Sequence, residues 1–152
     1  MSIQGSEKLS ASLEDYLEAI YNLSKVQTVA RSKEIAQSLG VSRASVTSAL
    51  QTLSEKGLVN YKPYGYITLT DKGRKLAARV AGRHDILKQF FADVLGVNAQ
   101  KAHEAACRAE HTMGPDITSR LTTLVDFLSQ SGDDGKNLIQ KFQRYWENVN
   151  GD

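Results

Sequence analysis

A pair of short helical segments joined by a glycine-containing turn constrains this 152-residue chain more than any other feature. Ser32 is typical of a helix N-cap, and the helical pattern that follows it stops at Gly40. Ser42 predicts the start of a second helix, which continues to a terminating Gly57. Ala36 is small at the point where the two helices must cross closely. This layout indicates a helix-turn-helix.

A β-hairpin is predicted immediately after the second helix. Residues 58–62 and 66–70 are short, β-rich runs, and Pro63-Tyr64-Gly65 between them supplies a turn. A plain helical hairpin would explain the two helices alone. The added strands favour the winged form of the helix-turn-helix.

The front of the second helix is short and polar, apart from Arg43. In DNA-binding helix-turn-helix proteins this end of the recognition helix enters the major groove, where small polar side chains reach bases and phosphates. Between Arg31 and Lys62 the chain has five basic and two acidic residues, which fits a phosphate-facing surface and also an ordinary solvated one. The predicted partner is double-stranded DNA. The residues expected at the DNA are Ser32, Ser42, Arg43, Ala44, Ser45, Thr47, Ser48, Gln51, Lys62 and Tyr64.

Helical periodicity dominates the rest of the chain. An amphipathic helix is predicted over residues 11–24, and a long helix runs from Thr70 or Asp71 to about Leu95. Further helices are predicted at about 99–113, 116–130 and 136–148, with residues 131–135 as a flexible connection. The fold class is therefore mainly α: an N-terminal winged helix-turn-helix over residues 1–75, then an all-helical domain over residues 76–152.

Composition narrows the environment and the function class. No apolar run approaches the roughly 20 residues that span a bilayer, and the N-terminus lacks the apolar core of a signal peptide. The single Cys107 allows no intramolecular disulfide, which fits a reducing compartment, so we expect a cytoplasmic protein. The chain has no phosphate loop, no G-x-S-x-G and no H-E-x-x-H, and this argues against an enzyme.

Metal-binding residue types gather in one helical segment. Cys107, Glu110 and His111 are spaced three and four apart, so a helix projects their thiolate, carboxylate and imidazole together. Taken alone, this trio would suit a buried structural cysteine beside a surface Glu-His pair about as well. The remaining histidines, His84 and His103, also lie on predicted helices near this segment in the chain, which favours a metal cluster.

The sequence resembles the iron- and manganese-dependent repressors of the diphtheria toxin repressor type over most of its length, from Leu13 to Trp146. The segments that carry the resemblance are Glu14 to Tyr21, Ile35 to Thr47, Leu69 to Gly73, Arg83-His84 and His103 to His111. The resemblance implies a homodimer in which metal sites link the DNA-binding half to a dimerisation and metal-binding half.

The resemblance also implies a mixed ligand set. Cys107, Glu110 and His111 match primary ligands of the iron branch, whereas Asp15 and Glu18 match ligands of the manganese branch. His84 matches a ligand in both branches, and His103 matches an ancillary ligand of the iron branch. Lys88 stands where that ancillary site is acidic, so such a site would need Glu18, Glu104 or Glu110 instead. The expected metal ligands are Asp15, Glu18, His84, His103, Cys107, Glu110 and His111.

These ligands predict a divalent transition metal. Cys107 disfavours manganese as the intended ion, while the carboxylates keep the site oxygen-rich, so we expect Fe(II), with Mn(II) next. Zn(II), Co(II) or Ni(II) could occupy the site in vitro. The expected function is a repressor of metal-homeostasis genes, in which metal fixes two recognition helices on a pseudo-palindromic operator. The alternative is a helix-turn-helix regulator that responds to a non-metal signal.

Overall fold

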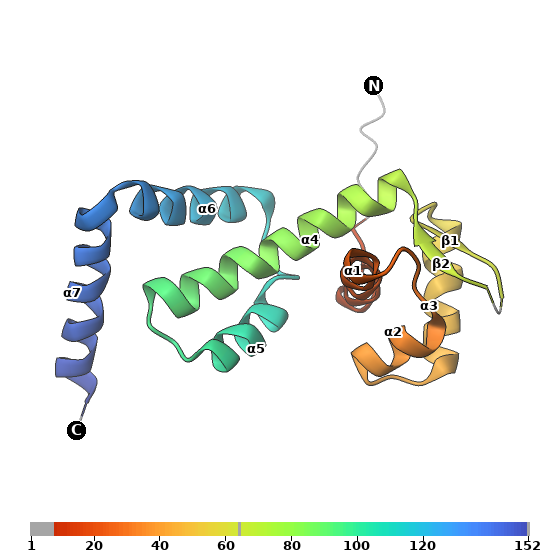
Figure 1. The fold of residues 1–152 in the computed structure, drawn as a ribbon, viewed down its shortest axis with the longest axis horizontal. Coiled ribbons are helices and arrows are strands. Elements are labelled where there is room, and N and C mark those ends of the chain that lie inside the picture. The colour runs from red at the N-terminus through yellow and green to blue at the C-terminus, as the bar shows by residue number, and fades with distance from the viewer. Residues whose placement is uncertain (1–7, 64, 152) are drawn as a thin grey trace. The chain divides into compact units, whose positions relative to one another are not determined.

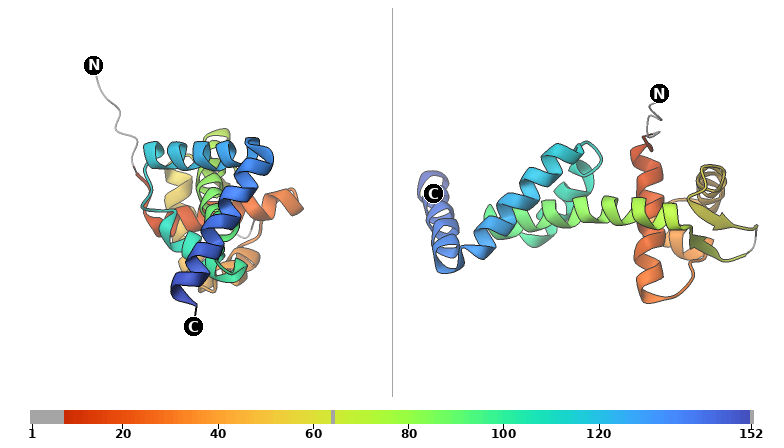
Figure 2. Two further views of the ribbon diagram at one scale, coloured as in Figure 1. Left: turned by 90° about the vertical axis from the view of Figure 1, so that its left-hand side faces the viewer. Right: turned by 90° about the horizontal axis from the view of Figure 1, so that it is seen from above.

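The computed structural model describes residues 8–63 and 65–151, and these divide into two compact units at Val80 and Ala81. Each unit is described separately. The predicted Tyr64 contact lies outside the described residues. Figure 1 shows the course of the chain, and Figure 2 gives two further views.

The N-terminal unit is a three-helix winged helix-turn-helix. Its elements are α1 (Ala11–Val26), α2 (Ser32–Leu39), α3 (Arg43–Glu55), β1 (Val59–Tyr61), β2 (Ile67–Leu69) and the first part of α4 (Asp71–Gln89). The two strands pair antiparallel, with Asn60 opposite Thr68. The predicted order of elements is confirmed, although the strands are shorter than the β-rich runs.

Apolar side chains from every element of this unit meet in one core. The fully buried members include Leu17, Ile20, Ile35, Val46, Leu50, Leu53 and Ile67. Burial of a Leu or Ile side chain stabilises a fold by about 1.5–3 kcal/mol, so this cluster fixes how the helices and the hairpin meet. Ala30 extends the small sheet, because its backbone exchanges two 2.9 Å hydrogen bonds with Ile67.

The helix-turn-helix is capped almost as predicted. Gly40 has φ 65°, a left-handed conformation that glycine adopts without strain, and the Ser42 hydroxyl accepts the Ser45 backbone N–H at 3.1 Å. The sequence predicted Ser32 as the N-cap of α2, and this is wrong. The helix begins at Ser32 and Arg31 takes the cap position, where its backbone N–H donates to a Glu34 carboxylate oxygen at 3.0 Å. The Glu34 carboxylate thus accepts the backbone N–H of the cap residue, as in a capping box, and the start of the helix is held without a Ser or Thr hydroxyl at the cap.

The long helix differs from the prediction at its C-terminal end. Thr70 caps α4, because its hydroxyl accepts the Gly73 N–H at 3.0 Å. A Cβ on Gly73 would overlap the Leu58 carbonyl oxygen, so the absence of a side chain allows close packing. The α-helix stops at Gln89, and a π-helix, η1 (Phe90–Val94), completes the predicted span. Apolar periodicity alone does not distinguish these two helical forms.

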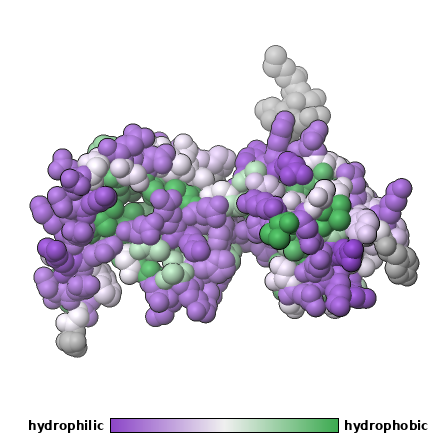
Figure 3. Space-filling model, viewed as in Figure 1, coloured by the Kyte–Doolittle hydropathy of each residue, from purple (hydrophilic) through white to green (hydrophobic). Residues whose placement is uncertain are grey.

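The C-terminal unit is helical throughout its regular structure. After the end of α4 and η1 come α5 (Ala99–Ala109), α6 (Pro115–Gln130) and α7 (Gly132–Asn150). The α-helix α5 ends four residues earlier than predicted, so His111 follows it in a turn. Figure 3 shows apolar surface alongside α6 in this unit. None of the helices in the described ranges has the length and apolar character to span a membrane.

The predicted flexible connection at residues 131–135 is wrong. Ser131 is instead the N-cap of α7, which already includes Gly132 to Gly135. Asp133 and Asp134 lie in its first turn, where carboxylates interact favourably with the helix dipole. Gly135 is buried, and a Cβ there would overlap the Leu128 carbonyl oxygen of α6. The glycines therefore mark a tight helix–helix corner.

Candidate metal centre and nucleic-acid interface

His84 and Glu110 form the buried centre of the candidate metal site. His84 lies on α4 with 7% of its surface exposed, and Glu110 is 1% exposed at the C-cap of α5. The His84 Nδ1 atom lies 2.8 Å from Glu110 Oε2. A buried carboxylate is costly unless it is paired or bound to a cation. The contact with His84 therefore stabilises the Glu110 carboxylate in its buried position.

His103 and Cys107 bring two more donors to His84 from one face of α5. The Cys107 Sγ atom lies 3.7 Å from His103 Nε2 and 3.8 Å from His84 Nδ1. The two imidazoles also approach each other, with His84 Nε2 3.1 Å from His103 Nδ1. One donor atom from each of these three residues lies within 4.8 Å of the other two.

These separations suit metal coordination. In a tetrahedral site with metal–sulfur bonds of about 2.3 Å and metal–nitrogen bonds of about 2.05 Å, sulfur and nitrogen lie about 3.6 Å apart. The donor set of thiolate, imidazole and carboxylate also suits borderline ions such as Fe(II), Co(II), Ni(II) and Zn(II). The residues present therefore fit a divalent transition metal.

The sequence-predicted trio is brought together in part. Glu110 links two histidines, because its Oε1 lies 3.3 Å from His111 Nε2 while its Oε2 contacts His84. Cys107 reaches this group through its contact with the His84 ring. The prediction from helical spacing underestimated His103, which the structure places beside both His84 and Cys107.

The other metal-ligand candidates have different settings. Asp15 is exposed and Glu18 half-buried on α1 of the N-terminal unit. Glu104 accepts a 3.4 Å hydrogen bond from Gln100 Nε2. Lys88, which stands where the ancillary site of the iron branch is acidic and is not itself a ligand candidate, is exposed on α4.

A cationic groove lies on the N-terminal unit, beside the first turns of α3. Its volume is about 840 Å³, and its wall includes Arg43, Thr47 and Gln51, which follow one another at i, i+4 and i+8 on the helix. Arg31 and Lys33 add two further cations from the start of α2. The lining residues, all within the described ranges, include no carboxylate. Such a surface suits a polyanion.

The predicted DNA-contact residues occupy different parts of this surface. Ser32 also lines the groove, whereas Ala44, Ser45 and Ser48 are exposed on α3 outside its wall. The Ser42 hydroxyl is engaged in capping and lies 2.9 Å from that of Ser45.

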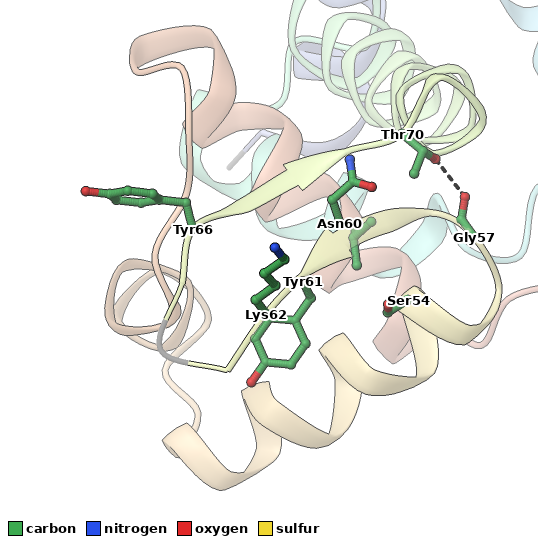
Figure 4. A pocket seen from close by; sticks show the side chains of 8 residues that line it. Ser54, Gly57, Asn60, Tyr61, Lys62, Tyr66 and Thr70 are labelled. Atoms are coloured by element: carbon green, nitrogen blue, oxygen red, sulfur yellow. Dashed lines mark hydrogen bonds between the residues drawn. The ribbon is translucent and has the colours of Figure 1, made fainter.

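A second hollow, of about 440 Å³, lies between the end of α3 and the hairpin. Figure 4 shows its lining, which includes Lys62 and Tyr61, with Thr70 hydrogen-bonded to the Gly57 carbonyl at 2.7 Å. Lys62, one of the residues predicted at the DNA, is exposed on the hairpin.

Arg31 and Tyr66 were missed by sequence reasoning. The Arg31 guanidinium lies 5.2 Å from the centre of the Tyr66 ring, and its Nη2 donates to the Tyr66 hydroxyl at 3.4 Å. Both line the cationic groove. The two residues are 35 positions apart in the chain, so no local pattern could pair them; only the position of Arg31 directly before α2 hinted at a role.

Two family models match most of the chain. Residues 8–67 match the N-terminal DNA-binding domain of iron-dependent repressors, and residues 70–138 match the metal-binding and dimerisation domain of the same family. The division between the two matches falls within β2, just before α4.

Curated relatives are similar over nearly their whole length. An uncharacterized HTH-type transcriptional regulator of Methanocaldococcus jannaschii is 36% identical over 78% of this chain and 95% of its own. The HTH-type transcriptional regulator MntR of Bacillus subtilis is 32% identical over 91% of this chain and 96% of its own.

Solved structures share the architecture. A manganese-dependent transcriptional repressor in complex with manganese superposes with a TM-score of 0.70 at 30% identity, over 76% of this chain and 53% of the other. ScaR with bound Zn²⁺ superposes with a TM-score of 0.64 at 33% identity, over 76% and 54%. The chain thus spans about half the length of these solved proteins. Because both halves match in order and the curated relatives align almost end to end, the chain belongs to the iron-dependent repressor family of metal-dependent transcriptional repressors.

Proposed function

We propose that this protein is a metal-activated repressor of metal-homeostasis genes, with Fe(II) as the favoured ion and Mn(II) next. The observation that carries the proposal is the cluster of His84, His103, Cys107 and Glu110 in the same chain as a cationic helix-turn-helix groove. The manganese bound to a similar solved repressor supports a divalent transition metal as the ion. The Cys107 thiolate supports a preference for Fe(II), which is softer than Mn(II).

We propose seven ligands, of which His84, His103, Cys107, Glu110 and His111 belong to the C-terminal unit. Asp15 and Glu18 are added because of the family resemblance and their carboxylate chemistry. When bound, the metal supplies positive charge that neutralises the carboxylates and joins ligands from different elements. His84 and Glu110 orient each other, and the helical positions of His103 and Cys107 hold their donor atoms toward His84.

The proposed coupling follows from where the ligands lie in the chain. Asp15 and Glu18 belong to the DNA-binding unit, so a metal that also used them would favour one arrangement of the recognition helices in a homodimer. Metal would then increase operator affinity by its higher affinity for that arrangement. A protein that acts on an operator works where the chromosome lies, so we propose a cytoplasmic location.

The deciding experiment is anaerobic DNA binding to genomic fragments with Fe(II), Mn(II), Zn(II) or a chelator. Binding that appears with Fe(II) and Mn(II), and disappears with chelator, is expected. Binding that ignores both metal and chelator would leave a helix-turn-helix regulator of a non-metal signal and would remove the proposed role of the cluster.

A further inference from the structure

The C-terminal helix carries a regular line of exposed apolar side chains. Leu138, Phe142, Tyr145 and Val149 on α7 are 58%, 40%, 68% and 62% exposed. They are spaced four, three and four residues apart, which is the alternation of the a and d positions in a coiled coil. Trp146, also exposed, lies at the edge of this line.

A neighbouring face of α7 is already used within the unit. Gly135 packs closely on the Leu128 carbonyl, and Gln143 Nε2 lies 3.3 Å from the carbonyl oxygens of Asp93 and Val94. Ile139, between these two positions, is half-buried. The exposed line lies about a quarter turn around α7 from these positions. The described elements leave its four side chains between 40% and 68% exposed.

We infer that α7 pairs with α7 of a second copy of this chain in an antiparallel coiled coil. We call Leu138, Phe142, Tyr145 and Val149 the α7 seam. Their order favours a second α7 as the partner, because each seam residue faces another seam residue when one of the two helices is reversed. Leu138 then faces the partner's Val149, and Phe142 faces the partner's Tyr145, so every a position meets a d position. A two-fold axis generates both pairs from one surface, as a closed dimer requires.

Charge favours the antiparallel direction. Asp133 and Asp134 occupy the first turn of α7, and a parallel pair would bring both acidic turns together. Reversal separates these turns. It also places Lys136 level with the C-terminal end of the partner helix, where a cation is favourable.

This surface extends beyond the segment of the chain that matches the metal-binding and dimerisation domain of the family. The matched domain ends at residue 138, so Phe142, Tyr145 and Val149 lie outside it while α7 continues from it without a break. The α7 seam would thus add a second contact to the dimer that the family domain implies.

Directed cross-linking tests both the partner and the register. In a Cys107→Ala background with chelator, Phe142→Cys and Tyr145→Cys are made as separate chains of different mass. They are oxidised alone and after co-production. Disulfide-bonded dimers should form in the mixture, joining one chain of each kind, because the facing a and d positions lie within disulfide reach.

The other outcomes overturn the inference. Efficient cross-linking of either single chain with itself would indicate a parallel pair. Loss of cross-linking in every combination would show that α7 does not face a second α7. The test uses neither DNA nor metal, so it can succeed or fail separately from the proposed repressor function.

Solution mass gives an independent measure with a matched control. Tyr145→Glu places a charge in the seam, whereas Gln140→Glu places one on an exposed position of α7 outside it. Dimer dissociation should shift to higher protein concentration for Tyr145→Glu only, as followed by sedimentation. Equal dissociation of both variants and the wild type would contradict the seam. Helix content by circular dichroism checks that both variants fold.

Discussion

The imidazole of His84 lies 2.8 Å from the carboxylate of Glu110, although 26 residues separate them in the chain. One residue comes from the middle of α4 and the other from the end of α5, and both are buried. The contact gives the C-terminal unit a polar centre, to which His103, Cys107 and His111 are joined. Changes at this centre should therefore affect metal response before they affect the fold of the DNA-binding unit.

Glu110→Ala should abolish metal-stimulated operator binding. The change removes one carboxylate that contacts both His84 and His111, so both the charge and the orientation of the proposed ligands are lost. Loss of an outer-shell partner typically lowers metal affinity by about 10–100-fold, so loss of Glu110, itself a proposed ligand, should lower it by at least that much, as measured by competition with a metal indicator. Asp85→Asn, at an exposed position on α4, is the control and should keep the response. Retained stimulation in Glu110→Ala would remove Glu110 from the ligand set.

Cys107→Ser should weaken binding of thiophilic ions more than binding of Mn(II). The hydroxyl replaces a thiolate that lies 3.7–3.8 Å from two imidazoles, and hard oxygen donors suit Mn(II) better than sulfur does. Cobalt substitution gives a direct measurement, because sulfur-to-Co(II) charge transfer should be seen in the near ultraviolet for the wild type and be absent in Cys107→Ser. Cys107→Glu should shift the ranking of ions further toward Mn(II). An unchanged spectrum in Cys107→Ser would show that the thiolate is no ligand.

Arg31→Ala should weaken DNA binding on all sequences to a similar extent. Arg31 lies in a groove with Lys33 and Arg43 and stacks on Tyr66, which favours phosphate contact over base recognition. Each lost phosphate contact should reduce the slope of log affinity against log salt by about 0.9. Lys25→Ala removes a cation that lies over Tyr21 outside this groove and should leave the slope unchanged. A changed sequence preference with an unchanged slope would assign Arg31 to base recognition instead.

Gly73→Ala and Gly82→Ala should change stability in opposite directions, although both lie in α4. A methyl group at Gly73 would overlap the Leu58 carbonyl, and such overpacking costs about 1–3 kcal/mol. At Gly82 a Cβ would meet nothing within 4 Å, so alanine should stabilise the helix by about 0.5–1 kcal/mol. Thermal unfolding of both variants checks the pair. Equal effects would show that helix propensity alone decides.

Local patterns predicted most of the N-terminal unit, because its elements follow each other along the chain. The left-handed Gly40, the Ser42 cap and the antiparallel hairpin were all visible as residue types at fixed spacing. The pairing of Ala30 with Ile67 was not, because it joins segments 37 residues apart that share no pattern. The same limit hid the stacking of Arg31 on Tyr66.

The prediction of the C-terminal unit was less complete for physical reasons. The glycines and aspartates of residues 131–135 are typical of a loop. Gly135, however, allows close packing on Leu128, and Asp133 and Asp134 are favourable in the first turn of a helix. Helical spacing placed Cys107 and Glu110 together without showing that His103 and His84 contact each other across two helices. The candidate metal ligands were identifiable by type and by family resemblance, while their mutual distances depended on tertiary packing.

The amide of Gln143 has a consequence for trimming the chain. Its two hydrogen bonds satisfy the Asp93 and Val94 carbonyls at the end of η1, where helices leave acceptors without internal donors. Removing α7 would therefore expose the last turn of the helical run that begins with α4. Amide hydrogens of residues 90–97 should exchange with deuterium faster in such a shortened protein. The C-terminal helix thus supplies the cap of a helix that lies about 50 residues earlier in the chain.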